Sequence, residues 1–306
     1  MKGRDLARRL RWFDQGAAAL ARTRPGLPSP AYACPLCLGL FRREAVEANE
    51  LTDEHVPPRS IEPRAPRLLT CVVCNSASSS RFDAHLAKAH LMNTWGTPLT
   101  AGPLPATLTL GDLQLRGVMA NDGNGPHYTL IPKQNDPRDF LRLVKAIIDP
   151  DDGEVPTVDL SVVAPHDASA AAMATVRAAY LAAFVLFGYR YILRPALDRV
   201  RYMITADDRS VIPLLQDNEG DLSARFIIPS IGEPARLRGA VAVIVGRDRV
   251  LLPGTDEVVD VFDAVSSMST TDPLGALAPD VAGAFPWPDS PTYMHDTGVD
   301  RAPTTR

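Results

Sequence analysis

Apolar side chains recur along the chain with two different periods. The first helical period covers residues 4–22, where the apolar positions are three or four apart: Leu6, Leu10, Phe13, Ala17 and Leu20. This spacing places them on one face of a helix, and the proline-rich stretch that follows should end it. We predict an amphipathic helix that packs against the next part of the chain.

Strand-like alternation follows in the middle of the chain. Residues 107–122 alternate as one strand, a glycine-rich turn comes next, and residues 127–132 return as a hairpin partner. An aspartate followed by proline then indicates a capped helix over residues 136–149. Residues 155–165 are predicted to form a further strand.

Residues 168–194 form the longest apolar pattern in the sequence. Its second half is apolar on nearly every face, which predicts a long helix buried in a domain centre or at an interface. Short runs rich in valine, isoleucine and leucine predict additional strands at 225–231, 239–247 and 249–253. The pattern therefore indicates an α+β fold.

Changes of composition divide the chain into three parts. We expect an N-terminal domain over residues 1–95, a mixed α+β domain over residues 96–275, and a flexible tail rich in proline, aspartate and threonine over residues 276–306. Residues 1–95 contain 14 lysines and arginines against 9 acids, whereas the remainder contains 18 against 27. The basic N-terminal part is the one expected to contact phosphate.

The composition also limits the cellular setting. Arg177 and Arg190 interrupt the apolar helix, so we expect no membrane span, and no signal-peptide pattern begins the chain. All four cysteines fall in two Cys-x-x-Cys pairs, which is unlike a secreted disulfide scaffold. These features predict a reducing, cytoplasmic location.

The two cysteine pairs form a predicted structural zinc site. Each pair allows two thiolates to converge on one ion, and two pairs complete a closed tetrahedral shell: Cys34, Cys37, Cys71 and Cys74. The alternatives are a redox dithiol or buried free thiols. Four protein ligands leave no open position on the ion, so any catalytic group has to lie elsewhere.

The segment between and after the cysteine pairs contains the candidate chemistry. It reads Glu54-His55-Val56-Pro57-Pro58 before the second pair, Asn75 directly after Cys74, and Phe82-Asp83-Ala84-His85-Leu86 soon afterwards. A neutral imidazole can take a proton from water near pH 7, and a carboxylate is a suitable ligand for Mg2+. This combination is typical of phosphodiester hydrolysis.

Over residues 31–91 the ordered motifs resemble the HNH nucleases of the His-Me finger (ββα-metal) superfamily, in their zinc-stapled bacterial group. The resemblance implies that His55 is the general base and that Glu54 is a ligand of a catalytic Mg2+ or Mn2+ ion. It implies that Asn75 either braces the segment holding the base or touches the metal. Asp83 is the expected second metal ligand, with His85 as the reserve.

The sequence departs from the family pattern after Asn75. A serine-rich stretch occupies the position where the family often has Lys-Gly, so Arg81 and Arg59 are the expected phosphate-binding residues. A degenerate, inactive module is therefore one alternative. Asp83 could also be an ordinary acid of a helix first turn, where the helix dipole favours it.

Three functions remain open from the sequence. The resemblance implies a DNA endonuclease that leaves a 5′-phosphate and a 3′-hydroxyl, with restriction or anti-phage defence as the expected setting. A non-catalytic, zinc-stapled nucleic-acid-binding protein is the second. In the third, the second domain binds a protein or small-molecule signal that controls the nuclease. The apolar helix around Tyr180–Tyr191 is the expected homodimer face.

Overall fold

A computed structural model gives the structure of the chain in two compact units. It describes residues 3–27, 30–59, 61–62, 65–94, 103–121, 125–148, 157–162, 165–216, 220–254, 260–268, 278–279 and 283–287. Unit 1 combines Met1–Ala87 with Asp167–Arg306, and unit 2 is Lys88–His166. Both units contain helices and strands, which confirms the predicted α+β class.

The two units divide the chain differently from the domains expected at 1–95 and 96–275. The cysteine-bearing segment shares unit 1 with the chain after residue 167, and unit 2 is inserted between them. The physical reason is that the long apolar helix packs against both parts of unit 1. The insertion begins within a helix, where composition gives no boundary signal.

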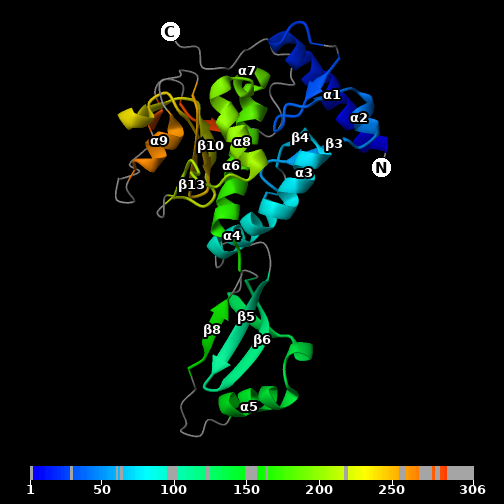
Figure 1. The fold of residues 1–306 in the computed structure, drawn as a ribbon. Coiled ribbons are helices and arrows are strands. Elements are labelled where there is room, and N and C mark those ends of the chain that lie inside the picture. The colour runs from blue at the N-terminus through cyan, green and yellow to red at the C-terminus, as the bar shows by residue number, and fades with distance from the viewer. Residues whose placement is uncertain are drawn as a thin grey trace. The chain divides into compact units, whose positions relative to one another are not determined.

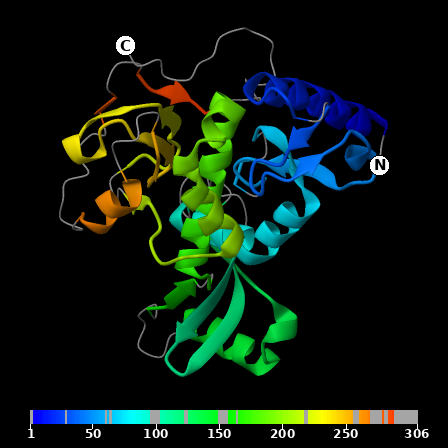
Figure 2. The same ribbon diagram turned by 45° about the horizontal axis from the view of Figure 1, so that its top comes forward.

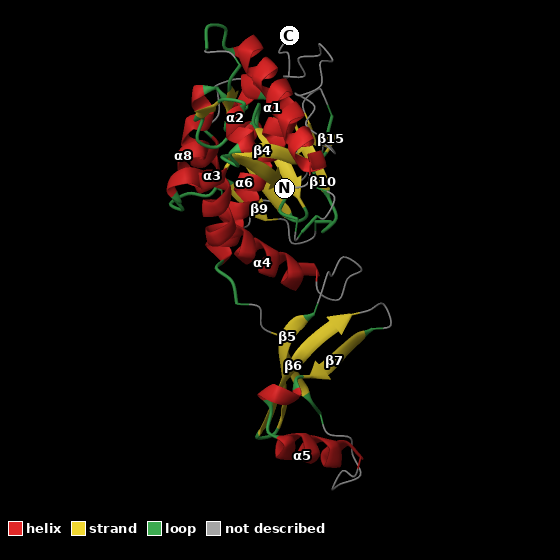
Figure 3. Cartoon of the chain, turned by 90° about the vertical axis from the view of Figure 1, so that its right-hand side faces the viewer, coloured by secondary structure: helices red, strands yellow, loops and turns green. Residues whose placement is uncertain are grey.

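The first helix, α1 (Gly3–Thr23), confirms the amphipathic helix predicted from the sequence. Its apolar face buries Phe13, Ala17 and Leu20 against the strands that follow, and Figure 3 shows α1 packed on β4. A guanidinium nitrogen of Arg9 donates to the carbonyl of Leu51 at 3.0 Å. The helix therefore fixes the hairpin through both apolar contacts and a buried hydrogen bond.

After α1 the chain forms two short hairpins and a run of helices. The elements are β1 (Tyr32–Ala33), β2 (Leu40–Phe41), α2 (Glu44–Glu47), β3 (Leu51–His55), β4 (Arg67–Cys71), α3 (Val72–Ser78), a π-helical turn η1 (Ser79–Asp83) and α4 (Ala84–Thr94). Strands β1 and β2 are antiparallel, as are β3 and β4, where His55 is opposite Arg67. Because α3 begins directly after β4, the hairpin and helix form one ββα arrangement.

Helix α6 (Ala168–Phe187) is the centre of unit 1. It contacts η1 on one side and strands of the C-terminal sheet on another, and Figures 1 and 2 show it between these two parts. The side chain of Asp167 caps its start by accepting from the backbone N–H groups of Ser169 and Ala170. The predicted helix over 168–194 is interrupted at Gly188, whose φ of 71° favours glycine.

The tyrosines expected to form a homodimer face lie inside unit 1. The hydroxyl of Tyr180 donates to the carbonyl of Pro35 at 2.8 Å, and that of Tyr189 donates to Ala33 at 2.7 Å. Both rings are buried. The expected face is therefore an internal contact, because α6 is covered by the cysteine-bearing segment. By length and composition α6 could cross a membrane, but 94% of its most apolar window is buried within the structure.

The C-terminal half of unit 1 folds into a sheet beside α6. Its remaining elements are α7 (Tyr189–Ile192), η3 (Pro195–Leu197), α8 (Asp198–Ala206), β9 (Leu214–Gln216), β10 (Arg225–Ile228), β11 (Ile231–Glu233), η4 (Ala235–Leu237), β12 (Val241–Val245), β13 (Asp248–Leu252), α9 (Val261–Ser266), β14 (Ala278–Pro279) and β15 (Phe285–Pro286). The five-stranded sheet has the order β15-β10-β12-β13-β9, and its pairs are antiparallel. The apolar runs at 225–231, 239–247 and 249–253 are confirmed as strands.

Part of the expected flexible tail, 276–306, is held in this unit. Strand β14 pairs with β11, and β15 forms an edge of the five-stranded sheet next to β10. The indole Nε1 of Trp287 donates to the carbonyl of Val56 at 3.0 Å. These described residues of the tail are therefore paired, and the rest of the tail lies outside the described residues.

Unit 2 is a four-stranded antiparallel sheet with one longer helix. Its elements are β5 (Leu104–Leu110), β6 (Leu113–Asn121), β7 (Pro126–Leu130), η2 (Pro132–Gln134), α5 (Pro137–Ile148) and β8 (Asp159–Val162), and the sheet order is β7-β6-β5-β8. The predicted single strand over 107–122 is two strands, because Gly111 (φ 59°) turns the chain between them. Helix α5 is confirmed, and its Leu143 packs with Leu113 and Leu115.

Candidate functional site

The four cysteines converge at the base of the two hairpins. The thiols of Cys34, Cys37, Cys71 and Cys74 lie within 4.8 Å of one another. Cys34 and Cys37 lie between β1 and β2, whereas Cys71 ends β4 and Cys74 lies in α3. The backbone N–H groups of Cys71 and Cys74 point at the sulfurs of Cys34 and Cys71, at 3.4 and 3.5 Å.

This cluster fits a tetrahedral zinc ion. With zinc–sulfur bonds of about 2.3 Å, the sulfurs at two corners of a tetrahedron are ~3.8 Å apart. The Sγ atoms of Cys37 and Cys71 are 3.7 Å apart. Among the residues that the structure describes, these cysteines form the one group of three or more possible metal ligands that converge. The predicted zinc site is therefore compatible with the structure.

Asn75 ties the helix of the ββα arrangement to the strand that carries His55. Its side-chain nitrogen donates to the hydroxyl of Thr52 and to the carbonyl of Asp53, both at 3.0 Å. Of the two roles left open for this asparagine, the observed contacts are those of a brace. The brace acts on β3 two residues before His55.

His55 lies at the end of β3 among charged neighbours. Burial lowers the pKa of its imidazole, and the nearby cations Arg67, Arg59 and Arg8 lower it further, while Asp53 acts in the opposite direction. Its Nε2 atom is buried and has no hydrogen-bond partner. The neutral imidazole is therefore the favoured form near pH 7.

Glu54 is directed to a different set of residues. Its carboxylate is 4% exposed, and one oxygen lies 2.8 Å from a guanidinium nitrogen of Arg177, which is 1% exposed. A second nitrogen of the same guanidinium lies 3.7 Å from a carboxylate oxygen of Asp83. Burial raises the pKa of Glu54, and the attraction of Arg177 opposes this. Glu54 and Asp83 are thus brought together, around an arginine.

His55 and Glu54 therefore do not share a common set of partners. Adjacent side chains of a strand point to opposite faces. In agreement, the charges that act on His55 come from Asp53 and arginines of α1, β4 and the loop after β3, whereas those on Glu54 come from Arg177 and Asp83. The structure does not gather the candidate base and the candidate metal ligand into one cluster.

His85, the reserve metal ligand, has a contact of its own. Its Nδ1 atom accepts a hydrogen bond from the backbone N–H of Asp167 at 2.8 Å. Asp167 is the residue that caps α6. The observed contact of His85 is therefore with the start of α6 and leaves Nδ1 engaged.

These contacts decide how well the predicted Mg2+ site fits the structure. A Mg2+ ion requires oxygen ligands at about 2.0–2.1 Å in octahedral geometry. The oxygens of Glu54 and Asp83 instead face a guanidinium, and the Nδ1 atom of His85 already accepts a hydrogen bond. In this arrangement the three residues do not fit a divalent ion.

The expected phosphate-binding residues lie on the surface. Arg59 and Arg81 are both exposed, in the loop after β3 and in η1. Arg42 is exposed as well, whereas the guanidinium of Arg43 pairs with Asp14 at 3.0 Å. Arg64, a further arginine between the two cysteine pairs, lies outside the described residues. The exposed guanidinium groups of Arg59 and Arg81 can contact phosphate.

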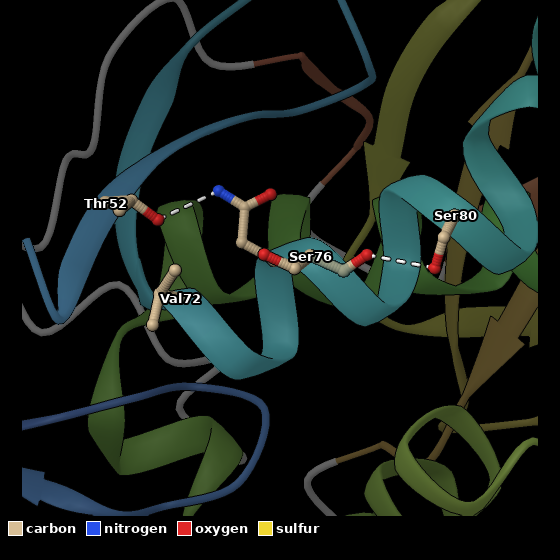
Figure 4. A pocket seen from close by; sticks show the side chains of 5 residues that line it. Thr52, Val72, Ser76 and Ser80 are labelled. Atoms are coloured by element: carbon tan, nitrogen blue, oxygen red, sulfur yellow. Dashed lines mark hydrogen bonds between the residues drawn. The ribbon is translucent and has the colours of Figure 1, made fainter.

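A shallow hollow lies beside the brace formed by Asn75. It has a volume of about 590 Å3 and is lined by Thr52, Val72, Asn75, Ser76 and Ser80. Figure 4 shows the hydroxyl of Thr52 beside the amide nitrogen, with Val72, Ser76 and Ser80 along the helical segment. Neither His55 nor Glu54 lines this hollow, so it is not the meeting point of the candidate catalytic groups.

Two residues near the candidate site were missed by the sequence reasoning. In the sequence Arg177 interrupts an apolar helix, and a charge inside a helix predicted to be buried needs a partner of opposite sign. That rule could have identified it as a partner for one of the acids. Trp287 lies in a proline-rich segment and carried no comparable signal.

Comparison of the chain with family models, curated proteins and solved structures gives no match.

Proposed function

We propose that this chain is a zinc-stapled endonuclease of the HNH type that hydrolyses DNA with His55 as its general base. The observation that carries the proposal is the brace between Asn75 and β3. It joins the helix of a ββα arrangement to the strand that ends in His55. The cysteine cluster holds the same helix and the strand that pairs with β3, because Cys71 ends β4 and Cys74 lies in α3.

The proposed reaction uses the free nitrogen of His55. The neutral imidazole accepts a proton from water, and the water oxygen forms a bond to phosphorus while the bond from phosphorus to the 3′ oxygen breaks. Solvent returns a proton to that oxygen, which gives a 3′-hydroxyl and a 5′-phosphate. The lowered pKa of His55, which keeps its imidazole neutral near pH 7, supports its role as the base.

Exposed arginines support a nucleic-acid substrate. Arg59 and Arg81 are free to approach a phosphate backbone, and Arg59 also acts electrostatically on His55. Binding through such residues releases counterions and weakens as the salt concentration rises. When bound, a divalent ion would neutralise charge on the phosphate, but its expected ligands, Glu54 and Asp83, contact Arg177.

The test compares cleavage of a supercoiled plasmid by the wild type and by His55→Ala, with Mg2+ and with Mn2+ present in turn. His127→Ala in unit 2 is the matched control, since it removes an imidazole from a strand of the other unit. We expect the wild type and the control to nick the plasmid and His55→Ala to be inactive. Equal cleavage by all three proteins would refute the role of His55.

A second function is favoured by one observation. The contact of Glu54 and Asp83 with Arg177 is what a non-catalytic, zinc-stapled nucleic-acid-binding protein would retain. Fluorescence anisotropy with labelled duplex DNA, followed over a range of salt concentrations, distinguishes the two. Salt-dependent binding without cleavage by the wild type would support this second function over the first.

A further inference from the structure

Arg177 occupies the position between the two carboxylates that the resemblance assigns to a metal ion. Its guanidinium contacts Glu54 at 2.8 Å and Asp83 at 3.7 Å. Arg177 belongs to α6, far along the chain from both acids, and its side chain is 1% exposed. The positive charge of this site is therefore supplied by the protein itself.

A guanidinium and a divalent ion cannot both be present at this place, because of their charge and the space they need. A metal ion bound to Glu54 would lie within a few ångströms of the guanidinium, and two cations at that separation repel strongly in a buried site. A Mg2+ ion at about 2.0–2.1 Å from an oxygen of each carboxylate would also need the space between them, where the guanidinium nitrogens lie at 2.8 and 3.7 Å from those oxygens. One cation has to leave before the other binds.

The position of Arg177 is fixed by its helix. Tyr180 lies three residues later, on the same side of α6, and its hydroxyl donates to the carbonyl of Pro35 beside the cysteine cluster. The start of the helix is held as well, since the backbone of Asp167 donates to His85. The guanidinium is thus held against Glu54 by contacts on both sides of it along α6.

We propose that Arg177 is the resident cation of the Glu54–Asp83 pair and that a divalent ion binds these carboxylates only when the guanidinium is removed. This inference deepens the proposed function, because it concerns the cation of the same hairpin. It predicts that the protein with its zinc bound has no divalent-ion site at Glu54. It also predicts that removal of Arg177 creates such a site.

The experiment measures Mn2+ binding by the zinc-loaded full chain, with electron paramagnetic resonance of free Mn2+ and with calorimetry. The variants are Glu54→Gln, Arg177→Gln, the double variant and a control, Arg225→Gln. Arg225 is partly buried, and its guanidinium donates to the backbone carbonyls of Leu222 and Ala224. The control therefore removes a partly buried positive charge that is not held between two carboxylates.

We expect Arg177→Gln to bind Mn2+ at least about tenfold more tightly than the wild type, which corresponds to ~1.4 kcal/mol. The double variant should lose this site, Arg225→Gln should not gain it, and Glu54→Gln should bind Mn2+ as the wild type does. Mn2+ should also raise the melting temperature of Arg177→Gln and leave that of the wild type unchanged.

Two results would overturn the proposal. One is a Mn2+ site in the wild type that Glu54→Gln abolishes, because the metal would then bind with Arg177 in place. The other is a folded Arg177→Gln that gains no site. If Arg177→Gln fails to fold, the comparison of the wild type with Glu54→Gln decides the matter alone. These binding measurements do not depend on DNA cleavage, so loss of the proposed nuclease activity would leave them interpretable.

Discussion

Replacing Arg177 by glutamine tests the energetic importance of the buried ion pair. The guanidinium is 1% exposed and Glu54 is 4% exposed, so solvent cannot replace either partner when the other is removed. Breaking such a pair by removing one partner typically costs ~3–5 kcal/mol. Because Arg177 also faces Asp83, its loss leaves two carboxylates without this cation. We expect Arg177→Gln to lower the free energy of unfolding by about 3–5 kcal/mol.

Glu54→Gln should destabilise the protein less than Arg177→Gln does. It removes one carboxylate and leaves Arg177 beside Asp83, and the neutral amide avoids the cost of burying a charge. We expect it to cost ~1–3 kcal/mol. In the double variant both charges are gone, so its cost should be smaller than the sum of the two single costs by at least ~1 kcal/mol. Urea unfolding followed by circular dichroism gives the three values.

The pH dependence of the free energy of unfolding checks independently in which direction the pKa of Glu54 is shifted. Burial raises the pKa of Glu54 above its ordinary value of 4.5, so the folded protein holds this proton more tightly than the unfolded chain. Stability from this group is therefore lost as the pH rises through the interval between the two pKa values. Without Arg177 the pKa of Glu54 should rise further. The loss of unfolding free energy in Arg177→Gln should therefore be smaller at pH 5 than at pH 7. The reasoning would be refuted if the costs of the two single variants simply add in the double variant, or if the loss in Arg177→Gln does not depend on pH.

Three further predictions concern the zinc site, the base and the C-terminal segment. Removal of zinc by a chelator should release about one zinc per chain and lower the melting temperature, because four thiolates hold the hairpins together. Cys37→Ser should likewise lose the zinc and melt at a lower temperature. An unchanged melting temperature with zinc absent would contradict this prediction. Cleavage should fall at acid pH with a midpoint below the ordinary histidine pKa of 6.5. Arg67→Gln should move that midpoint upward, since the variant removes a cation that lowers the pKa of His55. A pH profile with the same midpoint in both proteins would exclude this effect of Arg67. Trp287→Phe should destabilise the protein by about 0.5–1.5 kcal/mol in urea unfolding, because it removes the donor to the carbonyl of Val56; a loss well below ~0.5 kcal/mol would show that the bond has no net effect.

Local patterns in the sequence predicted local structure. The spacing of apolar residues in α1 and α5 identified both helices, because a helix with one buried face needs that period. Four cysteines in two short pairs identified the cluster, since each pair brings its own two sulfurs together. By contrast, the turn at Gly111 was missed because the alternation of apolar and polar residues continues on both sides of it.

Long-range partners could not be derived from such patterns. The pairing of Glu54 with Arg177 depends on how α6 packs against the hairpin, and no residue near either one in the sequence specifies it. Sequence spacing likewise placed Glu54 beside His55, whereas alternation along β3 directs the two side chains to different partners. Asn75 was predicted to be a site residue with two possible roles, and the observed bonds to Thr52 and Asp53 were needed to favour bracing over metal contact.

The insertion of unit 2 has a practical consequence for dissecting this chain. Its two ends are held close to one another, since the ammonium group of Lys88 donates to the carbonyl of Pro165 at 3.2 Å and His85 accepts from the backbone of Asp167. A chain truncated after residue 95 would lose Arg177 and leave Glu54 buried without its counterion. A chain in which residue 87 is joined to residue 167 by a short linker would retain α6. Unit 2 can therefore be treated as an exchangeable cassette, and the N-terminal segment cannot be treated as a separable one.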